Sequence, residues 1–221
     1  MQKTIVFIKR YPFAMLLAVQ LISILFYGVM TDSQLSHLIF NCLGLAVPIL
    51  AVWTVYRTPA TNWVSLVFAV IAIGITFISN YTNQSSLLIW AHIFESLLYF
   101  YAAASLVMMM FKDDIVTIDE LFAAAATFTL LIWAFAFAYS VVQQIYPGSI
   151  VSSVNPGAPR TWIELIFSSF SMQSNTGIGD IFPVNGIGRA IGSCQIFFGV
   201  MYTAIVVSRL VGIAASTKNK R

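Results

Sequence analysis

TWIELIFSSFSMQSNTGIGDIFP, residues 161–183, combines a short capped helix with a polar, glycine-containing stretch that follows it directly. Thr161 and Glu164 are three positions apart in a capping-box pattern, which predicts a helix of about three turns. Such a helix is roughly 18 Å long and cannot cross a hydrocarbon core of about 30 Å. In a membrane, this segment would have to enter and return on the same side.

The composition indicates that the chain is a membrane protein. Of its 221 residues, 59% are hydrophobic and 9% are charged, whereas soluble domains carry roughly a quarter charged residues. One oversized soluble core is the alternative, but it does not explain separate apolar runs that each reach about 20 residues. Six runs are expected to span a bilayer, at residues 11–30, 37–56, 62–80, 87–111, 118–146 and 186–213.

The distribution of basic residues predicts the orientation of the six spans. With both termini in the cytoplasm, only Arg160 and Arg189 lie outside, as the positive-inside rule requires. We therefore expect a multi-pass protein of a cell membrane, with a bacterial inner membrane as its location and the lipid bilayer as a partner. The inside residues are Lys3, Lys9, Arg10, Arg57, Lys112, Arg209, Lys218, Lys220 and Arg221.

The stretch Asn175 to Asp180 contains two glycines separated by one residue, Gly177 and Gly179. Irregular backbone at membrane depth is tolerated only where protein buries it or where it lines a watery cavity. Glycine adopts left-handed backbone angles without a side-chain clash, so consecutive carbonyls can turn toward one axis. Four copies would then form rings of oxygens that replace an ion's hydration shell.

These residues resemble the selectivity filter of the potassium-channel pore family. Thr176-Gly-Ile-Gly-Asp180 followed by Pro183 is similar to the family's Thr-Val/Thr-Gly-Tyr-Gly-Asp with a nearby proline. Residues 116–122 and 204–212 are also similar to the outer and inner helices of bacterial members, and Gly199 lies where the family often has a hinge glycine. The resemblance covers residues 115–213, whereas the four preceding spans match only in number.

The resemblance implies an all-α membrane protein with six transmembrane helices and a re-entrant pore helix and filter between spans five and six. Residues 1–112 would form a four-helix peripheral domain of the six-span, non-voltage-sensing kind, and residues 113–221 the pore domain of a homotetramer. Asn175, Thr176, Gly177, Ile178 and Gly179 would line the path of permeant monovalent cations. Potassium would bind at the first four of these, Ser174 and Asp180 would support the filter or its outer mouth, and Gly199 would be the gating hinge.

Several positions depart from the family's pattern. Asn175 replaces a threonine, and its amide is bulkier and both donates and accepts hydrogen bonds. Ile178 replaces the usual tyrosine, and Phe167 and Ser168 occupy positions where tryptophans often support the filter. The expected function is passive potassium conduction. The alternatives are a weakly selective cation channel that also passes sodium, a non-conducting channel-like subunit and a proton-coupled transporter.

The remaining ionisable residues suggest few other functions. Residues 87–111 contain no arginine, which excludes a voltage sensor built on an arginine ladder. His92 and Glu95 share one helical face, so they could be proton-linked, although contact with interfacial water or with a neighbouring helix is the favoured interpretation. No catalytic triad, metal-ligand spacing or phosphate loop is present, so we expect no enzyme activity, no cofactor and no nucleic-acid partner.

Charged residues also lie near both ends of the predicted pore domain. Asp113, Asp114, Asp119 and Glu120 could bind a divalent cation, but a solvated linker and a helix N-terminus stabilised by its dipole is the favoured interpretation. Arg209 could form a basic ring at a gate or anchor its helix to headgroups. Arg189 is a candidate partner for Asp180.

Overall fold

The computed structural model describes residues 11–29, 34–82, 84–112 and 117–218, with backbone alone for 34–43, 85 and 210–218. Lys3, Lys9, Arg10, Asp113, Asp114, Lys220 and Arg221, which the sequence analysis used, lie outside these residues. The elements are α2 (Pro12–Val29), α3 (Gln34–Val55), α4 (Asn62–Thr82), η1 (Ser85–Leu87), α5 (Leu88–Met110), α6 (Ile118–Ile145), β1 (Ile150–Ser152), α7 (Trp162–Gln173), β2 (Ile181–Pro183) and α8 (Gly186–Lys218).

The predicted apolar runs coincide with helices. Within the described residues, five helices are long and apolar enough to cross a membrane, namely α2, α4, α5, α6 and the Gly186–Arg209 part of α8. The run predicted at 37–56 corresponds to α3, whose described side chains form a shorter apolar helix, Gly44–Val55. The prediction of a helical protein with several potential spans is therefore confirmed.

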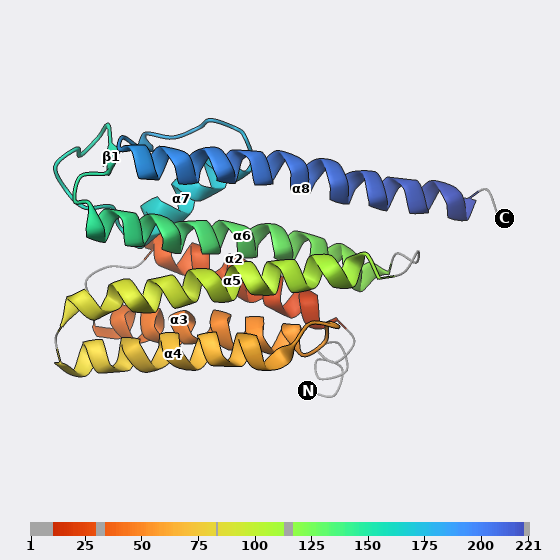
Figure 1. Ribbon diagram of the computed structural model, residues 1–221, viewed down its shortest axis with the longest axis horizontal. Coiled ribbons are helices and arrows are strands. Elements are labelled where there is room, and N and C mark those ends of the chain that lie inside the picture. Colours follow the sequence, from red (N-terminus) through yellow and green to blue (C-terminus); the bar gives the residue numbers. More distant parts are fainter. Residues whose placement is uncertain (1–10, 30–33, 83, 113–116, 219–221) are drawn as a thin grey trace.

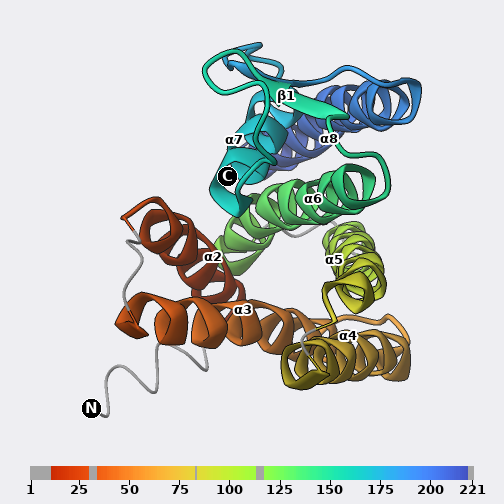
Figure 2. The ribbon, with the colours of Figure 1, turned by 90° about the vertical axis from the view of Figure 1, so that its left-hand side faces the viewer.

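Helix α6 occupies the centre of the molecule. The axes of α4, α5, α6 and α8 lie roughly parallel to one another (Figure 1), and the end-on view shows α7 and α8 on one side of α6 and α3, α4 and α5 on the other (Figure 2). Helix α2 packs against both α6 and α7. One hydrophobic core extends from Phe13 through Trp133 to Val206, so it crosses the predicted domain boundary at residue 112.

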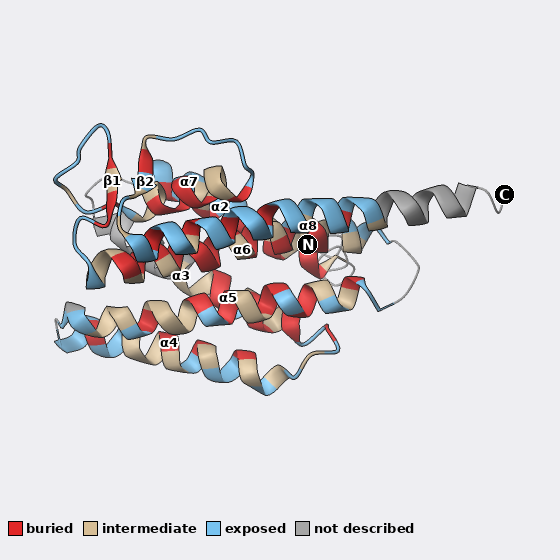
Figure 3. Cartoon of the chain, turned by 45° about the horizontal axis from the view of Figure 1, so that its top comes forward, coloured by how far each residue is buried: buried red, intermediate tan, exposed pale blue. Residues whose placement is uncertain are grey.

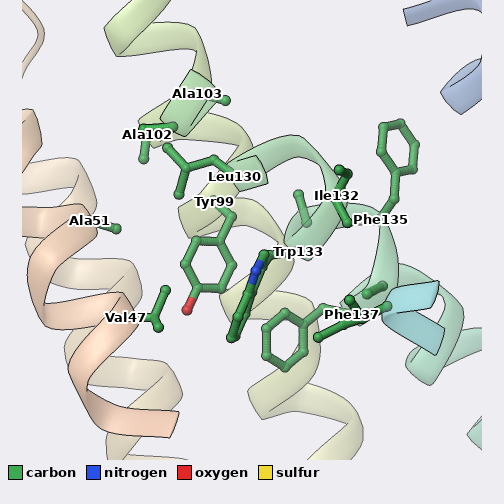
Figure 4. Packing of buried hydrophobic residues seen from close by; sticks show 14 of the residues in the cluster. Val47, Ala51, Tyr99, Ala102, Ala103, Leu130, Ile132, Trp133, Phe135 and Phe137 are labelled. Atoms are coloured by element: carbon green, nitrogen blue, oxygen red, sulfur yellow. The ribbon is translucent and has the colours of Figure 1, made fainter. Parts of the chain in front are cut away.

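The core between α5 and α6 is built from aromatic rings and small residues (Figure 4). Tyr99 stacks on Phe137 with ring centroids 5.6 Å apart, and it lies 6.0 Å from the ring of Trp133. Ala102 and Ala103 are buried in the same cluster, and small residues of this kind let two helices approach closely.

Thr117 and the two acidic residues after it determine where α6 begins. Thr117 has extended backbone angles, and its hydroxyl accepts a hydrogen bond from the Glu120 amide at 3.2 Å. Asp119 and Glu120 therefore lie in the first helical turn, where the helix dipole favours negative charge. This agrees with the favoured interpretation of these two residues.

The connection between α6 and α7 is held by a short antiparallel pair of strands. β1 and β2 pair in the register Ile150 with Pro183 and Ser152 with Ile181. The Val184 amide also donates to the Ser149 carbonyl at 2.8 Å. The strands thus join the chain before α7 to the chain after it, so that both ends of the intervening segment are fixed at one place.

Candidate functional site

Helix α7 is anchored at its N-terminus by a buried arginine. Arg160 is 4% exposed, and its Nη1 lies 3.2 Å from Glu164 Oε1 while Nη2 donates to the carbonyls of Asn155 and Ala158. Its backbone amide donates to Gln143 Oε1 at 2.6 Å, and its carbonyl accepts from Gln143 Nε2 at 3.0 Å. These bonds tie the start of α7 to the last turns of α6.

The predicted capping box is present, and α7 has the predicted length. The Thr161 amide donates to Glu164 Oε2 at 2.6 Å, so the Glu164 side chain reaches back to the first residue of the box. The helix has 12 residues and is therefore about 18 Å long. One carboxylate thus caps α7 and neutralises Arg160 at once.

A buried polar relay joins the middle of α7 to α6 and α8. The Tyr139 hydroxyl donates to Gln195 Oε1 at 2.7 Å, and Gln195 Nε2 donates to Ser169 Oγ at 2.6 Å and to its carbonyl at 3.0 Å. Ser169 Oγ in turn donates to the Ile132 carbonyl at 2.8 Å. The sequence analysis missed this relay, although a glutamine in an apolar span is a signal that could have revealed it.

The C-terminal end of α7 lies against the backbone of α8 at a glycine. A Cβ atom on Gly199 would lie 2.1 Å from the Gln173 carbonyl oxygen and 2.9 Å from its carbon. A Cβ atom on Gly192, two turns earlier, would lie 3.4 Å from Met172 Sδ, an ordinary contact distance. Helix α8 continues without interruption through Gly199. Close packing therefore requires glycine here, whereas the hinge role of Gly199 stays a prediction.

After α7 the chain turns through two residues with left-handed backbone angles. Asn175 has φ 56° and Gly177 has φ 64°, whereas Gly179 is not left-handed. Asparagine is one of the few non-glycine residues that tolerates this region. The sequence suggested left-handed backbone angles at Gly177 and Gly179, and the structure has them at Asn175 and Gly177. The asparagine that departs from the family's pattern therefore fits the backbone at its position.

The first residues of the turn remain bonded to the end of α7. The Ser174, Asn175 and Thr176 amides donate to the Phe170, Met172 and Ser171 carbonyls at 2.9, 3.2 and 3.2 Å. Ser174 Oγ also donates to the Phe170 carbonyl at 2.7 Å and lies 3.2 Å from Thr176 Oγ1. Ser174 thus ends α7 and connects the turn to the last residues of this helix.

The chain then returns alongside α7 toward the end at which α8 begins (Figure 1). A Cβ on Gly179 would lie 3.6 Å from Phe167 Cε1, and Ser168 Oγ donates to the Ile181 carbonyl at 3.2 Å. Asp180 Oδ2 accepts a bond from Ser152 Oγ at 2.6 Å. Arg189 donates to the Pro183 carbonyl at 3.4 Å instead of pairing with Asp180.

The predicted filter residues therefore lie in one continuous stretch on the surface of the chain. Residues 174–179 are all exposed, and the Ile178 side chain is 66% exposed. Most of the described side chains of α8 beside it, up to residue 209, are exposed, in contrast to the buried α6 (Figure 3). Within a single chain, nothing described covers this polar backbone.

His92 and Glu95 do not bond to each other. His92 Nδ1 lies 2.8 Å from Gln144 Nε2 and 3.1 Å from Ser140 Oγ, both on α6. Contact with a neighbouring helix was the favoured interpretation, and it holds for His92. Glu95 instead lines a cavity with Arg160 and Trp162.

The charged residues at the opposite end of α8 form an ion pair. Arg209 Nη1 lies 3.7 Å from Glu120 Oε2, and the Arg209 guanidinium lies 5.0 Å from the ring centroid of Phe111. Among the described residues, no group of three or more His, Cys, Asp or Glu could hold a metal ion.

Comparison with known proteins does not identify a family for this chain. No protein-family model, no curated protein and no solved structure matches the chain.

Proposed function

We propose that four copies of this chain form a passive, potassium-conducting channel in a cell membrane, with both termini in the cytoplasm. The observation that carries the proposal is the exposed stretch 174–179, which has irregular backbone and lies beside helices long enough to span a bilayer. Lipid cannot satisfy the amide and carbonyl groups of such a stretch. Further copies of the chain around a watery axis would satisfy them.

The backbone angles support carbonyl ligands for a cation. Left-handed residues at 175 and 177, on either side of Thr176, change the direction of successive peptide groups within three residues. We infer that the carbonyls of Thr176, Gly177 and Ile178 are the main ligands, with Asn175 at the inner end. The C-terminal end of α7 directly precedes this stretch, and the dipole of α7 favours a cation next to that end.

Closed symmetry explains why one chain leaves so much of α8 uncovered. In a fourfold homotetramer each chain supplies one quarter of the pore and meets its two neighbours through two different faces, since the interfaces of a ring are head-to-tail. The exposed face of α8 would contact those neighbours and line the inner part of the path. Permeant potassium ions would share the filter and displace one another, without a cofactor.

Recordings from purified protein in planar bilayers test the proposal. Under opposed potassium and sodium gradients, we expect single-channel steps with a reversal potential between zero and the potassium equilibrium potential, and closer to the latter. A reversal potential near zero would indicate the weakly selective alternative. Saturable transport without steps would indicate a carrier, and silence from correctly assembled tetramers would indicate a non-conducting subunit.

A further inference from the structure

A second candidate site lies between the peripheral helices and the start of α7. It is a cavity of about 440 Å³ lined by residues of α2, α3, α4, α5, α6 and α7. Its volume lies within the range of about 300–1,000 Å³ that is typical of small-molecule sites. Five aromatic side chains form much of its wall, namely Tyr27, Phe77, Trp133, Phe137 and Trp162.

The cavity carries one carboxylate that lacks a protein partner. Glu95 lies on its wall, and no hydrogen bond or ion pair joins Glu95 to any other side chain that the structure describes. Withdrawing a carboxylate from water is costly unless a cation or several donors pair with it. Glu95 therefore favours an occupant that brings a positive charge.

The two basic residues on the wall do not neutralise Glu95. Arg160 is already bound by Glu164 and by two carbonyls, and its position is fixed by Gln143. Since Gln144 Nε2 is a donor, His92 Nδ1 accepts its hydrogen bond. The imidazole therefore carries its proton on Nε2 and adds no charge.

We propose that this cavity binds a small organic cation, an amine or quaternary ammonium compound, with its charged group at Glu95. Aromatic faces attract such cations, most strongly where water is excluded. Hard metal cations do not fit, because they require six or more oxygen ligands and one carboxylate cannot supply them. The inference is independent of ion conduction, since the cavity lies within a single chain.

Binding of two isosteric probes tests the proposal. The full chain in dodecyl maltoside is titrated with phenethylammonium and with neutral 2-phenylethanol, and the fluorescence of Trp133 and Trp162 on the cavity wall reports binding. We expect saturable binding of phenethylammonium, at least about tenfold tighter than that of 2-phenylethanol. Equal affinity for the two probes, or no saturable binding of the cation, would overturn the proposal.

Variants at Glu95 separate binding from folding. Glu95→Gln should weaken phenethylammonium binding about tenfold and leave 2-phenylethanol unchanged. Glu95→Asp should retain the preference for the cation, and Glu120→Gln, at the other end of α6, should bind as the wild type does. If Glu95→Gln keeps the thermal stability of the wild type and still prefers phenethylammonium to 2-phenylethanol, Glu95 does not bind the cation and the proposal is wrong. Loss of the preference in Glu120→Gln would contradict the proposal equally.

Discussion

Helices α6 and α8 lie side by side and are both apolar enough to span a bilayer, but one chain covers them very differently. In an 18-residue apolar segment of each helix, 67% of the residues are buried in α6 and 22% in α8. Helix α6 is surrounded by α2, α5, α7 and α8, whereas α8 is buried along a single seam. That seam consists of Gly188, Gly192, Gln195, Gly199 and Val206.

This difference shows that apolar length and packing role are separate properties of a helix. Both helices have the length that a bilayer requires. Among the described side chains of α8, the seam residues are specialised, because Gly188 and Gly199 leave no room for a Cβ atom and Gln195 supplies hydrogen bonds. The exposed residues of this part of α8 are available to lipid or to other subunits. The predictions below test the seam first and then the exposed regions beside it.

The largest effect is expected at Gly199. An added methyl group would collide with the Gln173 carbonyl, so Gly199→Ala should lower stability by about 3 kcal/mol, the upper end for overpacking. Thermal unfolding in detergent measures this effect. Gly74→Ala is the matched control, because nothing lies within 4 Å of its new Cβ and alanine favours a helix. Equal melting temperatures for the two variants would contradict the close-packing role.

The buried relay should give the next effect. Gln195→Leu removes the bonds to Ser169 and Tyr139, at a cost of about 1–3 kcal/mol. The buried Tyr139 hydroxyl is then left with Met172 Sδ, a weak acceptor, as its partner. Tyr139→Phe removes this hydroxyl. The double variant should therefore lose less stability than the sum of the two single variants. Strict additivity in chemical unfolding would show that the relay does not act as a unit.

The third prediction concerns Asn175. Threonine is β-branched and disfavours the left-handed angle found there, so Asn175→Thr should cost about 1–2 kcal/mol in its present conformation. We expect residue 175 to relax toward an extended backbone and the reversal potential to move toward that of potassium. Asn175→Gly is the control, since glycine keeps the angle and removes only the amide. If the threonine variant has the selectivity of the wild type, position 175 does not limit selectivity.

The smallest effect is expected at the far end of α8. Arg209→Gln breaks a 3.7 Å ion pair with Glu120 in which both side chains are largely buried. The pair is longer than a hydrogen bond, and the N-terminal dipole of α6 still stabilises the Glu120 charge in the variant. The loss should therefore stay near the upper end for isolated ion pairs, about 1 kcal/mol. The melting temperature should fall slightly, and by nearly the same amount at about 1 M salt, because buried charges are screened much less than exposed ones. A loss larger than that of Gln195→Leu, or one that disappears in high salt, would contradict this.

Local signals in the sequence predicted most of the helices and the start of the candidate site. The capping pair Thr161 and Glu164 gave the position of α7, because a cap depends on residues three positions apart. Apolar runs gave the long helices for the same reason. The stretch 174–179 was recognised from its glycines, but its left-handed residue at Asn175 was not.

Apart from the backbone angle of Asn175, the missed features depend on contacts between distant segments. The attachment of Arg160 to α6 needs Gln143, and the relay through Gln195 needs three helices in register. Helical spacing placed His92 and Glu95 on one face, but it could not show that His92 bonds to α6 while Glu95 faces a cavity. Spacing along one helix contains no information about which neighbour each side chain meets.

An electron cryo-microscopy map of the purified protein, in lipid nanodiscs and potassium, tests the central claim most directly. The account predicts a fourfold assembly in which residues 174–179 of each chain surround the axis and density for ions lies between their carbonyls. A monomer, or an assembly in which this stretch faces away from the axis, would contradict it.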